Sequence, residues 1–153
     1  MRVLAVGDRQ PAWIGEGVGH YVARLPPAWR FRVDTLATAK RPKSDGAKRA
    51  REAESQALLA RSADEYRVLL DEQGKALSSS ALAAKLSDWQ RDGRDLCFLI
   101  GGPDGVTAEL RRRADFVWSL SPLTLPHGLA RILCVEQLYR AWSLQSGHPY
   151  HRA

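Results

Sequence analysis

The sequence is poor in cysteine, with only Cys97 and Cys134 among its 153 residues. Both stand in apolar runs, which excludes a disulfide framework and predicts two buried thiols in a reducing compartment. No apolar run approaches the roughly 20 residues that cross a bilayer, and too few residues precede Gly7 for a signal peptide. Repeats, linkers and low-complexity segments are also missing. These absences predict one soluble, cytoplasmic domain over residues 1–153, with no membrane partner.

Hydrophobic residues make up 44% of the chain, enough to form a core, which excludes a disordered polymer. Lysine and arginine number 23 against 17 acidic residues, a net charge of +6, and they gather at 40–51 and at 111–113. A basic surplus favours a polyanionic partner such as RNA, because binding releases counterions from the phosphates. A basic segment is equally compatible with an ordinary solvated surface.

Short apolar segments alternate with amphipathic ones along the whole chain. Runs of period two or of unbroken apolar character predict strands, and apolar residues at helical spacing predict helices. Their alternation, with connections long enough for crossovers, predicts an α/β fold with a mainly parallel sheet and helices on both faces. The predicted strands are 3–6, 31–36, 66–70, 96–100 and 116–118. Four of the predicted helices are 13–25, 48–61, 107–113 and 128–146. A fifth precedes the strand 96–100, with Ser79 or Ser80 as its cap and Asp92-Gly93 at its end.

Ligands of parallel sheets bind at the carboxyl ends of the strands, and three segments follow predicted strands: 70–74, 101–105 and 120–127. The second has three glycines in five residues, which let the backbone approach a ligand closely. It lacks the lysine and the spacing of phosphate-binding loops, which argues against a nucleotide-phosphate site. The alternative interpretation of this segment is a tight turn between a strand and a helix. The third holds three leucines and two prolines, which suits the wall of a pocket for a flat, uncharged ring. Its alternative is burial under another element.

The predicted helix 128–146 has apolar residues over an arc wider than one core-facing stripe, with Arg131, Glu136 and Arg140 inside this arc. This pattern indicates a subunit interface near a functional site, or else a helix enclosed within its own domain. Glu136 and Arg140 are spaced to form an ion pair. The tail 148–152 is dense in functional groups, although frayed ends are common. It offers no third metal ligand, so no metal site is predicted.

Four segments together resemble the RlmH family of small SPOUT-class methyltransferases, and the resemblance runs from Met1 to Arg152. They read GGPDG at 101–105, WSLS at 118–121, LTLPH at 123–127, and YRAW followed by HPYHR at 139–142 and 148–152. The resemblance implies a SPOUT-type α/β knot with a C-terminal trefoil, and a homodimer with its active site at the subunit interface. It also implies S-adenosylmethionine as cofactor and methylation of N3 of a pseudouridine in large-subunit (23S) ribosomal RNA.

The resemblance assigns cofactor binding to the ends of three strands. Pro122 departs from the family pattern, because a small residue other than proline is expected there and proline removes an amide donor. The residues implied are Leu70, Gly101, Leu120, Ser121, Pro122, Leu123, Thr124 and Leu125.

Transfer to N3 also requires that this nitrogen lose its proton, a task for a positioned base. The sequence shows no isolated, evidently buried carboxylate. The predicted catalytic residues, which would handle this proton or position the substrate, are His127 together with His151 and Arg152, the last two reaching the pocket of a partner subunit. A basic RNA-binding or ribosome-associated module without catalysis is the alternative. The predicted RNA-binding residues, which would hold phosphates or an oxyanion, are Arg111, Arg112, Arg131, Arg140 and Tyr150.

Overall fold

The structure is a computed structural model that describes residues 1–152, apart from the side chains of His151 and Arg152. Its five strands form one sheet in the order β2-β1-β4-β3-β5, and every neighbouring pair is parallel. This confirms the predicted α/β class. The strands are β1 Arg2–Val6, β2 Arg32–Leu36, β3 Tyr66–Ala76, β4 Leu96–Ile100 and β5 Phe116–Ser119.

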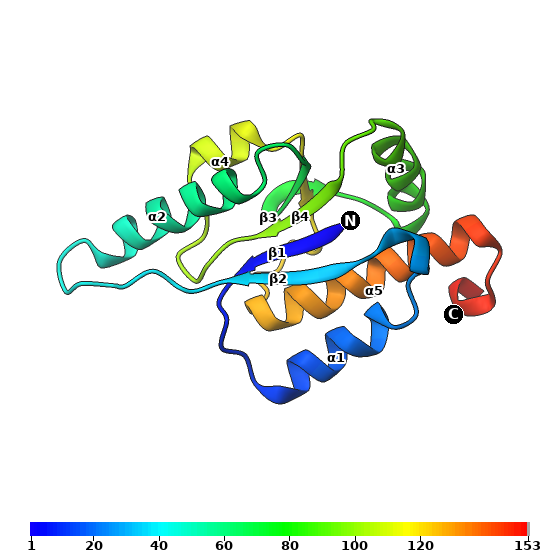
Figure 1. The fold of residues 1–153 in the computed structure, drawn as a ribbon, viewed down its shortest axis with the longest axis horizontal. Helices are drawn as coiled ribbons and strands as arrows, with labels where there is room; N and C mark the ends of the chain where they lie inside the picture. Colours follow the sequence, from blue (N-terminus) through cyan, green and yellow to red (C-terminus); the bar gives the residue numbers. More distant parts are fainter. Residues whose placement is uncertain (153) are drawn as a thin grey trace.

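Helices cover both faces of the sheet (Figure 1): α2 and α4 lie on one face, and α1, α3 and α5 lie on the other. None of the helices within the described residues combines the length and the apolar character needed to traverse a bilayer. The helices are α1 Ala12–Val22, α2 Gly46–Arg61, α3 Ser79–Arg91, α4 Ala108–Arg113 and α5 His127–Ser146, with short 3₁₀ turns η1 Pro27–Trp29 and η2 Pro149–Arg152.

The central strand β4 explains why the core has two halves. Its side chains alternate between the two faces, so Phe98 packs with α1, α3 and α5, whereas Leu99 packs with α2 and α4. A strand covered on both faces needs apolar residues throughout, as predicted for this segment. The predicted burial of both cysteines is also confirmed, and burial raises the pKa of Cys97 to about 12.

Three predicted boundaries are wrong. The first helix was predicted to run to Leu25, but α1 ends at Val22. Strand β3 was predicted to end at Leu70, but it continues to Ala76 and pairs again with β5 after a register shift between Leu70 and Lys75. The polar residues 71–74 look like a turn in the sequence, yet a β-bulge absorbs them without ending the strand. Helix α3 is capped by Ser78 and not by Ser79 or Ser80, because the Ser78 hydroxyl accepts the amide of Ala81 at 3.2 Å.

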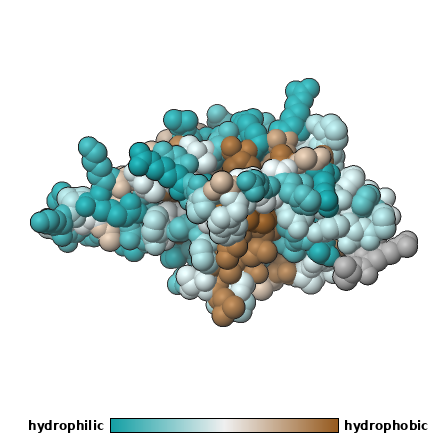
Figure 2. All heavy atoms as spheres, turned by 90° about the horizontal axis from the view of Figure 1, so that it is seen from below, coloured by the Kyte–Doolittle hydropathy of each residue, from teal (hydrophilic) through white to brown (hydrophobic). Residues whose placement is uncertain are grey.

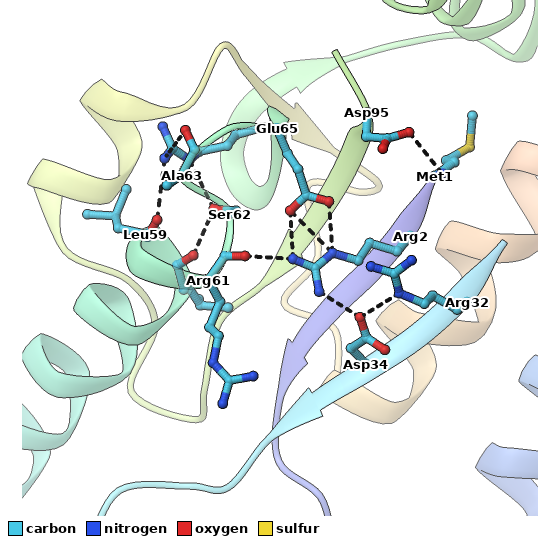
Figure 3. Close-up of polar contacts among 12 residues, drawn as sticks. Met1, Arg2, Arg32, Asp34, Leu59, Arg61, Ser62, Ala63, Glu65 and Asp95 are labelled. Atoms are coloured by element: carbon cyan, nitrogen blue, oxygen red, sulfur yellow. Dashed lines mark hydrogen bonds and ion pairs between the residues drawn. The ribbon is translucent and has the colours of Figure 1, made fainter. Parts of the chain in front are cut away.

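A network of ion pairs joins the strands at their amino ends (Figure 3), the edge of the sheet opposite to the predicted site. Arg2 on β1 donates to Glu65 at 2.6–3.2 Å and to Asp34 on β2 at 2.6 Å. It also donates to the Arg61 carbonyl at the end of α2. Because one guanidinium joins three elements, the amino edge of the sheet is held by fixed polar contacts.

Candidate active site

A cavity of about 330 Å³ opens at the carboxyl ends of β3 and β4 and is closed on one side by the segment after β5. We call it the strand-end cavity. The three segments predicted to follow strands converge on it. All the residues predicted to bind the cofactor line it except Pro122, which is exposed. The predicted lining residues are Leu70, Gly101, Leu120, Ser121, Leu123, Thr124 and Leu125.

The glycine segment 101–105 is both a tight turn and a wall of the cavity. The Gly105 amide donates to the Gly102 carbonyl at 3.0 Å, which closes the turn. Glu54 of α2 packs directly against Gly102, and a Cβ atom at this position would overlap the Glu54 carboxylate. Only glycine therefore permits this approach of α2 to the cavity wall.

Glu54 is a buried carboxylate, with 3% of its surface exposed, that sequence reasoning missed. Its Oε1 accepts the Ala39 amide at 2.9 Å and the Arg41 guanidinium at 3.3 Å, whereas Oε2 has no partner among the described residues. In the sequence it is hidden in a charged stretch. The signal that could have found it is helical spacing, since Ala50 and Leu58 stand four residues away on the same buried face.

The segment 120–127 is held as a cavity wall by polar contacts. The Thr124 hydroxyl donates to Glu72 in the extension of β3 at 2.7 Å, and the Ser121 hydroxyl accepts the Leu123 amide at 3.0 Å. Leu123 is 71% exposed, so burial under another element does not explain the apolar character of this segment. Nearby, Arg111 lines the cavity and donates to Asp71 at 2.8 Å.

His127, the first residue of α5, is the predicted catalytic residue that the structure places at the cavity. Burial is the main cause that lowers the pKa of His127, and the positive charges of Arg131 and Arg41 lower it further. The negative charges of Glu54 and Asp104 raise this pKa, but by less. Its imidazole is therefore neutral at neutral pH and able to accept a proton. Among the described residues, no three His, Cys, Asp or Glu side chains are grouped as ligands for a metal ion.

Arg131 lies one turn further along α5 and is only 4% exposed. Its Nη2 donates to the carbonyls of Val6 at 2.8 Å and Gly7 at 2.5 Å, and burial lowers its pKa. The guanidinium thus holds the carboxyl end of β1 instead of projecting into solvent. Arg112, by contrast, is exposed on α4. The RNA-binding roles of both residues remain predictions.

The C-terminal tail forms an ordered cluster at the other end of α5. Glu136 accepts from Arg140 at 2.9–3.0 Å, which confirms the predicted ion pair, and from the Tyr150 hydroxyl at 3.1 Å. The Arg140 guanidinium lies over the Tyr150 ring, and Tyr150 packs on Tyr139. Arg140 follows His127 by thirteen residues on one helix, a separation of about 20 Å. Within one chain, the tail is thus remote from the strand-end cavity (Figure 1).

The side chains of His151 and Arg152 lie outside the described part of the chain, so their predicted catalytic role remains a prediction. Their backbone belongs to η2, which adjoins the cluster of Glu136, Arg140 and Tyr150. Arg140 and Tyr150 lie in contact with each other, away from Arg111 and His127 of the same chain, and their RNA-binding role remains a prediction.

The fold and this cavity place the chain in a defined class. A family profile described as "Predicted SPOUT methyltransferase" matches residues 1–151, and the chain belongs to this family of methyl-transferring enzymes, which use a bound methyl donor. The predicted resemblance to the RlmH family is confirmed by proteins named Ribosomal RNA large subunit methyltransferase H. That of Chromohalobacter salexigens is 48% identical, over 99% of both chains. Those of Thioalkalivibrio sulfidiphilus and Alkalilimnicola ehrlichii are each 46% identical, over at least 98% of either chain.

A solved structure supports the fold independently of close sequence similarity. A "probable methylase family protein" from Haemophilus influenzae superimposes with a TM-score of 0.57 over 97% of this chain and 69% of its own length. Its sequence identity of 11% is low, so this comparison supports the arrangement of the elements and no finer property.

Proposed function

We propose that the chain transfers a methyl group from S-adenosylmethionine to N3 of a pseudouridine in large-subunit ribosomal RNA, in the cytoplasm. The observation that carries the proposal is the convergence of the glycine segment, the apolar segment 120–125 and a neutral His127 on one cavity at the strand ends. The names of its relatives supply the class of RNA.

The residues of the strand-end cavity suit this methyl donor. Leu120 and Leu125 would offer apolar surface to an adenine ring, and the missing side chain of Gly101 lets the cavity wall pack closely against Val106. Glu72 at the cavity favours a positively charged ligand, whereas the charge of Asp71 is compensated by Arg111. When bound, S-adenosylmethionine supplies a methyl group attached to a cationic sulfur. The chain therefore has to hold this group close to the acceptor and need not activate it.

The acceptor nitrogen carries a proton, and His127 is positioned to take it. Its imidazole is neutral because it is partly buried and faces the positive charge of Arg131. Glu54 is a less suitable base, since its carboxylate lies behind Gly102 and is occupied by Ala39 and Arg41. We therefore assign the role of general base to His127. Glu54 instead fixes the shape of the glycine segment by packing against Gly102.

The active form would be a homodimer. Trp13 on α1 is 55% exposed, and Leu129 and Leu133 on α5 are also exposed. Figure 2, which views the side of the molecule where α1 and α5 lie, shows a hydrophobic band at the centre of this surface, bordered by more hydrophilic atoms. A second copy on this face would cover the band and would account for the wide apolar arc of α5. It would also bring one tail towards the cavity of the other subunit.

We expect the double variant Leu129→Arg, Leu133→Arg to weaken the dimer at least 100-fold, because it places charges in an apolar interface. Sedimentation velocity would show a dimer for the wild type and a monomer for this variant. Ala60→Arg is the control, because Ala60 is exposed on α2, across the sheet. A wild-type protein that sediments as a monomer at micromolar concentration would contradict the proposed assembly.

Transfer of tritium from labelled S-adenosylmethionine tests the proposed reaction. Ribosomes or large subunits that lack the modification are expected to gain label in their large ribosomal RNA, and naked RNA serves as the comparison substrate. Calorimetric titration of the donor accompanies the assay. Absence of both labelling and donor binding would favour an RNA-binding module without catalysis, whereas labelling of another atom would reject only the assignment of N3.

A further inference from the structure

A second cavity, of about 520 Å³, opens at the carboxyl ends of β1 and β2. We call it the β1–β2 cavity. It shares Pro103 and His127 with the strand-end cavity, so the two lie side by side and His127 belongs to the wall of both. Its lining residues come from the segments 6–10 and 37–40.

The floor of this cavity is a built structure. Gly7 has a positive φ of 102°, and its amide donates to the Leu36 carbonyl at 2.7 Å, which ties the ends of β1 and β2 together. Behind it, the buried Arg131 donates to the carbonyls of Val6 and Gly7. A Cβ at Gly7 would lie 3.3 Å from the Arg131 guanidinium, so glycine permits both the turn and this close contact.

Arg131 is a buried cation without a carboxylate partner among the residues that the structure describes. Its Nε has no partner within the described part of the chain, and its hydrogen bonds reach only backbone carbonyls. A buried charge without a counterion is costly and favours a nearby anionic or electron-rich ligand. Arg131 does not itself line the β1–β2 cavity, because it lies behind Val6 and Gly7, so its positive charge acts on a ligand there only through space.

The polar groups of the β1–β2 cavity match a nucleotide. Arg9 and Lys40 are exposed cations that could pair with phosphates, and only Asp8 among its lining residues carries a negative charge. The amide of Gln10 provides both a donor and an acceptor, which is what hydrogen bonding to the edge of a uracil-type base requires.

We infer that the β1–β2 cavity receives the target nucleotide of the RNA, turned out of its stack, with the base edge at Gln10 and the flanking phosphates at Arg9 and Lys40. The inference rests on the proposed function and deepens it. A base in this cavity would lie next to a methyl donor in the strand-end cavity, with His127 at their boundary to take the proton. Methyl transfer requires this adjacency.

Two sets of variants test the inference with ribosomal substrate. Gln10→Ala is expected to lower kcat/KM for methyl transfer about tenfold by removing contacts to the base edge. The double variant Arg9→Ala, Lys40→Ala is expected to weaken RNA binding and to reduce the salt slope of log K by about two. Arg91→Ala is the matched control, because Arg91 is an exposed cation at the end of α3. Donor affinity, measured by calorimetry, should remain unchanged in all three.

Crosslinking locates the nucleotide directly. RNA with 4-thiouridine at the target position is expected to crosslink to residues 7–10 or 37–40 of the wild-type protein. Crosslinks confined to other segments, or variants that transfer as well as Arg91→Ala, would overturn the inference while wild-type transfer upholds the proposed function. A loss of donor affinity in Gln10→Ala would show that the cavity holds part of the donor, and this too would overturn it. Failure of the wild type to transfer would instead reject the proposed function.

Discussion

Replacing Gly102 by alanine is expected to reduce methyl transfer about 100-fold and to weaken donor binding in parallel. The new Cβ would overlap Oε2 of the buried Glu54 carboxylate, which can move away only by giving up the contacts of its Oε1 with Ala39 and Arg41. The glycine segment would have to move into the strand-end cavity, and displacements of about 1 Å cost rate factors of this size. Calorimetric titration of the donor and a single-turnover transfer assay would measure both effects.

The cause of this loss is open to a direct check. Gly15→Ala on α1 is the control, because a Cβ there meets no atom within 4 Å. Combining Gly102→Ala with Glu54→Ala should restore part of the donor affinity, since the second change removes the overlapping carboxylate. Unchanged donor binding in Gly102→Ala, in a protein that unfolds at the wild-type urea concentration, would show that Glu54 does not shape the cavity.

The variant His127→Ala is expected to lower the transfer rate by a factor of about 10²–10⁴, the usual contribution of a positioned base, with little change in donor affinity. The wild-type rate should rise with pH and then level off, because protonated His127 cannot accept a proton. The inflection should fall below the usual histidine value of about 6.5, since burial and the charge of Arg131 lower the pKa of His127. Single-turnover rates across the pH range would measure it.

A second variant separates this role from a structural one. Glu54 raises the pKa of His127, so Glu54→Gln should move the inflection to lower pH. A merely structural loss would lower the rate at every pH without moving the inflection. If His127→Ala keeps the wild-type rate and profile, another group takes the proton, and the candidate is then the tail residue His151, because an arginine such as Arg152 stays protonated and can only donate.

The structure contains the predicted strands wherever the hydrophobic pattern of the sequence agrees with the tertiary packing. The apolar run Leu96–Ile100 predicted a strand covered on both faces, and β4 contacts both halves of the core. The end of β3 was missed because residues 71–74 have turn composition, whereas pairing with β5 extends the strand beyond them. Glu54 was missed because a carboxylate in a charged stretch normally faces solvent, and its burial depends on Gly102, which lies far away in the sequence.

The amino-acid sequence by itself determined the α/β class, the family and the segments that border the strand-end cavity, because hydrophobic periodicity and local motifs are properties of neighbouring residues. Only the tertiary structure decided which side chains meet. The burial of Glu54 and Arg131, the neutral state of His127 and the β1–β2 cavity beside it all arise from contacts between distant segments. The tail's distance from its own cavity is likewise a consequence of the straight path of α5, which no local pattern encodes.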